Sequence, residues 1–145
     1  MSAVHLRGLR IEIDGRAVVD GVDLDVAPGE CVAIVGESGA GKSLTARALL
    51  GMLPAGAHMA TDDLRIDGVE ASGLSESSWR SLRGRRIALI SQDALAALDP
   101  LRRIGREVAE PMEIHRLHPG RRKEQVVALR ATLAHPHPAR RAPRR

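Results

Sequence analysis

Gly36-Glu37-Ser38-Gly39-Ala40-Gly41-Lys42-Ser43 is a glycine-rich loop with the pattern Gly, four residues, Gly-Lys-Ser. Glycines allow backbone angles and a close approach that a Cβ would block. Successive backbone N–H groups then point inward as a nest for an anion, and the following helix adds its own unpaired donors. Lys42 is placed to reach the β- and γ-phosphates of a nucleotide, and the Ser43 hydroxyl to ligate the Mg²⁺ that a triphosphate brings. The pattern predicts a phosphate-binding loop (P-loop).

The flanks of this loop agree with that interpretation. Cys31-Val-Ala-Ile-Val35 has no polar interruption, which predicts a strand buried on both faces. Residues 44–50 combine strong helix formers with apolar spacing, and Gly51 and Pro54 end the helix. Strand, glycine loop and helix are the context that the motif requires, which disfavours the alternative of a flexible glycine turn. The dinucleotide fingerprint Gly-x-Gly-x-x-Gly is absent, which weakens a nicotinamide or flavin alternative.

The remaining patterns predict an antiparallel hairpin before the loop and mixed elements after it. Residues 4–13 and 17–26 alternate apolar and polar positions around the turn signal Asp14-Gly15. Ser75 suits the N-cap of a short helix, and Pro111 must start, bend or break the helix that contains it. After the loop we expect a strand and turn at 62–70, a helix at 75–82, an apolar strand at 86–90, and helices at 101–117 and 121–134.

Composition limits the classes of function. The chain has 145 residues, enough for one domain with a core, and it contains one Trp, no Phe and no Tyr. That argues against aromatic platforms that stack the bases of single-stranded nucleic acid. The one cysteine, Cys31, excludes a disulfide framework, and we expect it to be a small buried hydrophobe in a reducing compartment. No signal-peptide pattern or bilayer-spanning apolar run is visible, so we expect a soluble chain that can still dock on a membrane partner.

The basic character belongs to the C-terminal part. The net charge is +4, but residues 121–145 hold eight basic residues against one acidic residue, whereas residues 1–120 hold 14 basic and 17 acidic. From residue 135 the sequence has no periodicity and three prolines, which predicts a disordered basic tail. His135 and His137 lie in it without the further ligands that a metal needs. No nucleic-acid partner is expected.

Three blocks together resemble the ATP-binding subunits of ABC transporters, most closely the dipeptide and oligopeptide importer type. They are Val35–Pro54 around the loop, Leu82–Asp93 followed by Ala97–Leu101, and the upstream stretch Val19–Glu30. The resemblance covers about residues 4–130. It implies an α/β fold, a P-loop NTPase core with an N-terminal antiparallel β hairpin, incomplete at the C-terminus. Residues 1–134 would be the N-terminal part of such a domain, with the core to about 95, the start of a helical subdomain at about 96–134, and the tail at 135–145.

The resemblance also implies a site and partners. The cofactors would be ATP and Mg²⁺, and Gln92 matches the Q-loop glutamine that contacts the metal or the attacking water. Lys42 and Gln92 would act in catalysis, and Ser43 and Gln92 at the metal. The partners would be the membrane subunits and a second ATP-binding subunit, at the cytoplasmic face of the membrane as a peripheral protein. The nucleotide would be held by Gly36, Glu37, Ser38, Gly39, Ala40, Gly41, Lys42, Ser43 and Leu44.

The chain departs from the family in several places. Ile13 or a neighbour stands where the family stacks an aromatic residue on adenine. Ala94 follows the Gln-Asp pair, where proline is usual in the family. Trp79 is too far along the chain to replace the missing aromatic residue, and we expect it to be partly buried on a surface helix. The Leu-Ser-Gly-Gly-Gln type signature, the strand ending in Asp-Glu and the switch histidine are absent.

Residues 131–145 resemble an out-of-frame continuation, which suggests a frameshifted or truncated chain. ATP hydrolysis is therefore open, and a non-hydrolysing nucleotide-binding fragment or pseudogene product is the alternative.

Overall fold

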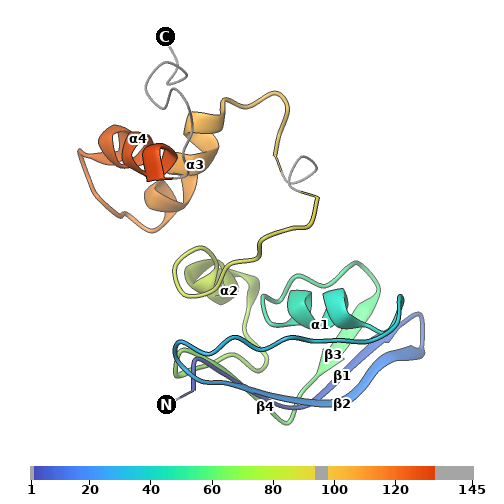
Figure 1. Ribbon diagram of the computed structural model, residues 1–145. Helices are drawn as coiled ribbons and strands as arrows, with labels where there is room; N and C mark the ends of the chain where they lie inside the picture. The colour runs from blue at the N-terminus through green and yellow to red at the C-terminus, as the bar shows by residue number, and fades with distance from the viewer. Residues whose placement is uncertain (1, 94–97, 133–145) are drawn as a thin grey trace. The chain divides into compact units, whose positions relative to one another are not determined.

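The structure is a computed structural model that describes residues 2–93 and 98–132. It is a mixed α/β fold in two compact units, Met1–Leu89 and Ile90–Arg145, each of which is described by itself. The first unit holds five strands and the helices α1 (Lys42–Ala48) and α2 (Glu76–Leu82). The second holds α3 (Ile104–Ile114) and α4 (Arg122–Thr132). Figure 1 labels these elements.

An antiparallel sheet forms the base of the first unit, as the hairpin pattern predicted. β1 (Val4–Ile13) pairs with β2 (Arg16–Val26) through the turn at Asp14-Gly15, where both residues have positive φ. On its other side β1 pairs with β4 (Asp63–Ile66) and β3 (Ala57–Ala60), and β4 pairs with β5 (Val69–Glu70). The predicted strand and turn at 62–70 is thus β4 and β5. The short strand β3 was not predicted, because its sequence Ala-His-Met-Ala has no β-branched residue.

The core lies between this sheet and the two helices. Leu6, Leu9 and Ile11 of β1 are fully buried, and Ala48 and Leu82 join them from α1 and α2. Figure 1 shows α1 against one face of the sheet. The helix predicted at 44–50 is α1, which begins two residues before the predicted start, at Lys42, and ends at Ala48. Its side chains at Thr45 and Ala48 are buried. The core positions α1, and with it the loop that precedes α1.

The sequence prediction for Trp79 is wrong, because this residue belongs to the core. It is only 5 % exposed, although partial burial on a surface helix was expected. Its helix α2 forms where it was predicted, with Ser75 as N-cap accepting a hydrogen bond from the Ser78 backbone N–H at 3.3 Å. The ring fits because Gly51 has no side chain: a Cβ there would lie 2.6 Å from the Trp79 Nε1.

The predictions of an apolar strand at 31–35, before the loop, and of another at 86–90, before Gln92, are wrong. Residues 31–35 form no strand, and Val35 is 86 % exposed. Cys31 is exposed as well, so the prediction of a buried thiol is also wrong. In residues 86–90 Ile87 makes only an isolated bridge to Arg83, and Ile90 is 95 % exposed. A strand needs a neighbouring backbone to pair with, and within residues 2–93 and 98–132 no backbone hydrogen bond joins Cys31–Val35 to another segment.

The second unit is a pair of helices. α3 and α4 lie within the spans predicted at 101–117 and 121–134, and each buries an apolar residue, Met112 in α3 and Val126 in α4. Pro111 sits inside α3 rather than at its end, where it removes one backbone donor from the helix. No helix of the described ranges is both long and apolar enough to cross a bilayer. The predicted tail at 135–145 lies outside the described residues.

The Gly51–Trp79 contact gives a prediction about stability. Gly51→Ala places a methyl group against the buried ring at a residue with φ of +61°, so we expect a loss of about 1–3 kcal/mol in the free energy of unfolding. Gly73→Ala is the matched control, since Gly73 has a similar φ of +68° but nothing within 4 Å of the added Cβ. Urea unfolding measures both variants, and equal losses would contradict the contact as the cause.

Candidate functional site

The glycine-rich loop leads directly into α1. Gly41 is the N-cap of this helix, with φ 81° and ψ 2°, and its carbonyl accepts the first helical bond, from the Thr45 N–H at 2.8 Å. Gly39 also has a left-handed φ, of 86°, and the Ala40 N–H donates to the Glu37 carbonyl at 3.2 Å. Left-handed backbone at two positions turns the chain sharply into the helix, a conformation that L-residues disfavour. The predicted strand is missing, but the predicted loop-to-helix junction is present.

Gly41 needs to be glycine for a second reason, because strand β2 lies against it. A Cβ at Gly41 would lie 2.7 Å from Val19 Cγ2 and 3.2 Å from the Val18 carbonyl oxygen. In the β1–β2 ladder Ile11 faces Val19 and Glu12 faces Ala17, so Val18 is the extra residue of a β-bulge. Bulges commonly redirect a strand beside a functional site. The sequence prediction did not place Val18 and Val19 beside the loop. The run of three apolar residues Ala17-Val18-Val19, which breaks the alternation of this strand, is the signal that could have indicated them.

Lys42 folds back over the loop. Its ammonium group donates to the carbonyl oxygens of Gly36, at 2.8 Å, and Glu37, at 2.6 Å. Both acceptors are neutral, so these bonds leave the positive charge of the side chain uncompensated. An anion offered at this point would be a stronger acceptor for the same donors, because a charge-assisted hydrogen bond is stronger than a neutral one.

Ser43 and Thr45 lie in the first turn of α1 and differ in role. The side chain of Ser43 is exposed, whereas Thr45 is buried and its hydroxyl donates to the Gly41 carbonyl at 3.0 Å. In the parts of the chain that the structure describes, no group of three His, Cys, Asp or Glu side chains could hold a metal ion. A single exposed hydroxyl such as that of Ser43 suits Mg²⁺, because this ion keeps several waters and takes further oxygen ligands from a bound nucleotide.

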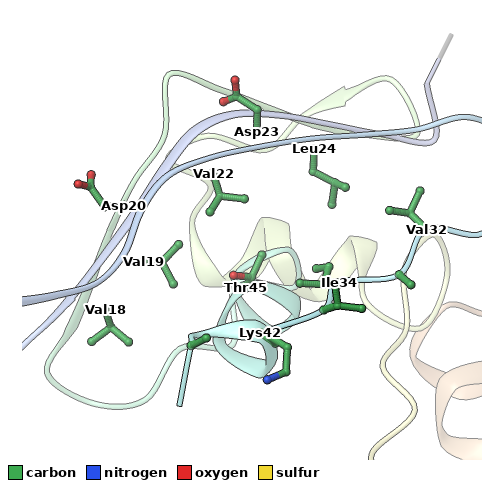
Figure 2. Close-up of a pocket in the computed structure, with 13 residues that line it drawn as sticks. Val18, Val19, Asp20, Val22, Asp23, Leu24, Val32, Ile34, Lys42 and Thr45 are labelled. Atoms are coloured by element: carbon green, nitrogen blue, oxygen red, sulfur yellow. The ribbon is translucent and has the colours of Figure 1, made fainter. Parts of the chain in front are cut away.

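A pocket of about 510 Å³ opens between β2, residues 32–35 and α1. Figure 2 shows the apolar side chains of Val22 and Leu24 on one side of it, and Ile34, Lys42 and Thr45 on the other. Its carboxylates, Asp20 and Asp23, point away from Lys42 in this view. Both have partners: Asp20 pairs with Arg10 Nε at 3.2 Å, and Asp23 accepts from the Gly8 N–H at 2.7 Å. Neither is placed as a base near the loop.

Gln92 and the glycine-rich loop belong to different units of the structure. Gln92 is an exposed residue of the second unit, and the loop belongs to the first, so each is described by itself. Ala94, which follows the Gln-Asp pair, lies outside the described residues, as do His135 and His137. Ile13, expected near the adenine, is the last residue of β1 and pairs with Arg16. The predicted roles of Gln92 and Ile13 stay predictions.

Comparison with known proteins adds independent findings. The family model for ABC transporters matches residues 19–145. The oligopeptide transport ATP-binding protein OppD of Mycobacterium tuberculosis H37Rv is 36 % identical over 135 residues, which cover 92 % of this chain and 22 % of the relative. The dipeptide transport ATP-binding protein DppD of Lactococcus lactis subsp. cremoris MG1363 is 40 % identical over 94 residues, or 65 % of this chain and 27 % of the relative. OppD of L. lactis subsp. cremoris SK11 is 35 % identical over 126 residues, or 86 % and 37 %. The chain thus spans roughly a fifth to two fifths of these relatives' length.

The contact between Gly41 and Val19 gives a prediction about packing. Gly41→Ala should cost about 1–3 kcal/mol of folding free energy more than Gly39→Ala, because both glycines have a left-handed φ but only Gly41 has neighbours within 4 Å of the added Cβ. Adding Val19→Ala to Gly41→Ala removes the clashing Cγ2, so the double variant should lose less than the sum of the single losses. Chemical denaturation measures all four variants. Strict additivity would show that Val19 does not constrain the loop.

Proposed function

The chain belongs to the ABC transporter family, and from that premise we propose that its loop at residues 36–43 binds the phosphates of Mg·ATP. The observation that carries the proposal is the conformation of the loop. Left-handed glycines turn the backbone into the start of α1, and Lys42 lies over the loop on two neutral carbonyls. Phosphate oxygens would take the place of these carbonyls as acceptors for Lys42, and the backbone N–H groups of the loop and of the first turn would hold the same anion.

Each predicted site residue then has a defined task. Gly36, Gly39 and Gly41 let the backbone approach the phosphates, and the N–H groups from Glu37 to Leu44 would donate to them, that of Ala40 once it leaves the Glu37 carbonyl. Lys42 neutralises charge on the β- and γ-phosphates. The exposed hydroxyl of Ser43 would ligate Mg²⁺, and Gln92 is proposed as a second group at the metal or the attacking water. The metal would offset negative charge on the phosphate oxygens.

The names of the relatives suggest a setting for this binding. The matched proteins carry names of oligopeptide and dipeptide transport ATP-binding proteins. We therefore propose that the chain is part of an ATP-binding subunit for import of peptides or a related solute. Its partners would be the membrane subunits and a second ATP-binding subunit at the cytoplasmic face of the membrane, where ATP binding and hydrolysis would be coupled to transport.

Binding without hydrolysis is the second candidate for this chain by itself. Among the described residues that line the pocket beside the loop, the carboxylates are Asp20 and Asp23, which are paired with groups of β1 and point away from Lys42. Hydrolysis needs a group that orients or deprotonates the attacking water within hydrogen-bond reach. Neither of these two carboxylates is placed to do so, which favours binding without hydrolysis by the pocket as the structure describes it.

A binding measurement tests the proposed function. Lys42→Ala should weaken Mg·ATP binding by about tenfold or more, because it removes charge-assisted bonds to phosphate. Arg47→Ala is the matched control, since it removes an exposed positive charge from the last turn of the same helix. Isothermal titration calorimetry on the whole chain measures both. Equal affinity in the wild-type chain and in Lys42→Ala would refute the loop as the phosphate site.

A turnover measurement separates the two candidates. The purified chain with Mg·ATP should release inorganic phosphate no faster than buffer does, while it still binds the nucleotide. The control is the Lys42→Ala variant, whose phosphate release reports any contaminating ATPase. Release by the wild-type chain that the variant loses would show that a catalytic group is present and would favour hydrolysis.

A further inference from the structure

Arg83 connects the C-terminal end of the P-loop helix to α2. Its Nε donates to the Leu50 carbonyl at 2.7 Å and its Nη2 to the Gly51 carbonyl at 2.8 Å. Both carbonyls lie just beyond α1, which ends at Ala48. Arg83 itself follows the last residue of α2, and its side chain is only 22 % exposed. One guanidinium therefore joins two segments that are more than 30 residues apart in the sequence.

The same side chain is also bonded to residues of α2. Its Nη1 donates to the Glu76 carboxylate at 2.7 Å, and its guanidinium lies 5.8 Å from the centre of the Trp79 ring. Hydrogen bonds from Arg83 are the main reason that the pKa of Glu76 lies below its usual value. The planar fork of arginine matches such a set of acceptors, whereas a lysine ammonium is a single mobile point charge.

A fixed end matters for a helix as short as α1. The helix has seven residues, and its first residue is Lys42, so the loop and the Arg83 contacts stand at opposite ends of two turns. The last carbonyls of a helix carry partial negative charge, which a cation beside them offsets. A short helix held only at its loop end can tilt or fray, and either motion would move the donors at its first turn.

We propose that Arg83 is a positioning residue for the phosphate site, acting through α1. It holds the carbonyl end of the helix against α2 and so keeps Lys42 and the neighbouring N–H groups aligned for phosphate. This inference rests on the proposed function, since it deepens the assignment of ATP phosphates to the loop. Leu50, Gly51 and Glu76, which accept hydrogen bonds from Arg83, all lie outside the glycine-rich loop, so the motif itself does not indicate this role.

The first test needs no nucleotide. Hydrogen exchange on the whole chain compares the wild type with Arg83→Met, which keeps the length of the side chain and removes its donors. Exchange in a peptide covering residues 36–48 should rise roughly threefold to thirtyfold, as expected for a coupling of moderate size between distant positions. A rise confined to residues 50–52 and 76–83 would show a merely local cap and would overturn the proposal.

The second test measures affinity for Mg·ATP and for Mg·ADP by calorimetry. Arg83→Met should weaken Mg·ATP by roughly threefold to thirtyfold and Mg·ADP less, because the donors that lose alignment serve the terminal phosphates. A general loss of folded protein would weaken both nucleotides equally, and that result would contradict positioning. Arg83→Lys should recover little, since one ammonium cannot replace the fork.

Arg80→Met is the matched control on the same helix. Arg80 pairs with the same Glu76 at 3.4 Å but is 75 % exposed, and the structure gives it no bond to Leu50 or Gly51. It should leave both loop exchange and nucleotide affinity at the wild-type values, and an effect equal to that of Arg83→Met would refute the specific role of Arg83. If the wild-type chain binds no ATP while loop exchange still rises in Arg83→Met, the positioning contact stands and the proposed function fails.

Discussion

The close approach of Gly41 to strand β2 is the contact on which the geometry of the site depends. Val19 and the carbonyl of Val18 occupy the space that any side chain at Gly41 would need. The sheet thereby sets where α1 begins, and the buried Ala48 side of the helix sets its direction. Arg83 and Trp79 then fix the far end at Leu50 and Gly51. A short helix is held at both ends, and the loop is held by the helix.

Much of this arrangement could be predicted from the sequence, because it depends on local signals. Asp14-Gly15 turns β1 into β2, Ser75 caps α2, and the glycine pattern with Lys42 marks the start of α1. Each of these features needs only a few neighbouring residues to form. The contacts at Val19 and Arg83 could not be predicted in the same way, since they join residues that are far apart in the sequence and leave no periodic pattern.

The failed predictions have a common physical cause. An apolar run such as Cys31–Val35 indicates that a segment suits a buried strand, but it does not supply the neighbouring backbone that a strand needs. In the described parts of the chain that neighbour is missing, so Cys31, Val32 and Val35 are exposed instead of buried. For Trp79 the prediction underestimated burial, because only the structure shows that Gly51 leaves a space for the ring. Residue type predicts a preference for burial, but burial also requires a neighbouring segment that packs against the residue.

The proposed phosphate site consists of the backbone N–H groups and Lys42 at the start of α1. The most direct measurement is a titration of the ¹⁵N-labelled chain with Mg·ATP, followed by amide chemical shifts. We expect the largest shifts at the N–H groups of Gly39, Gly41, Lys42 and Ser43, with strong broadening at Ser43 when Mn²⁺ replaces Mg²⁺. Shifts concentrated in α3 and α4, or a loop that does not respond at a nucleotide concentration that shifts other residues, would contradict it.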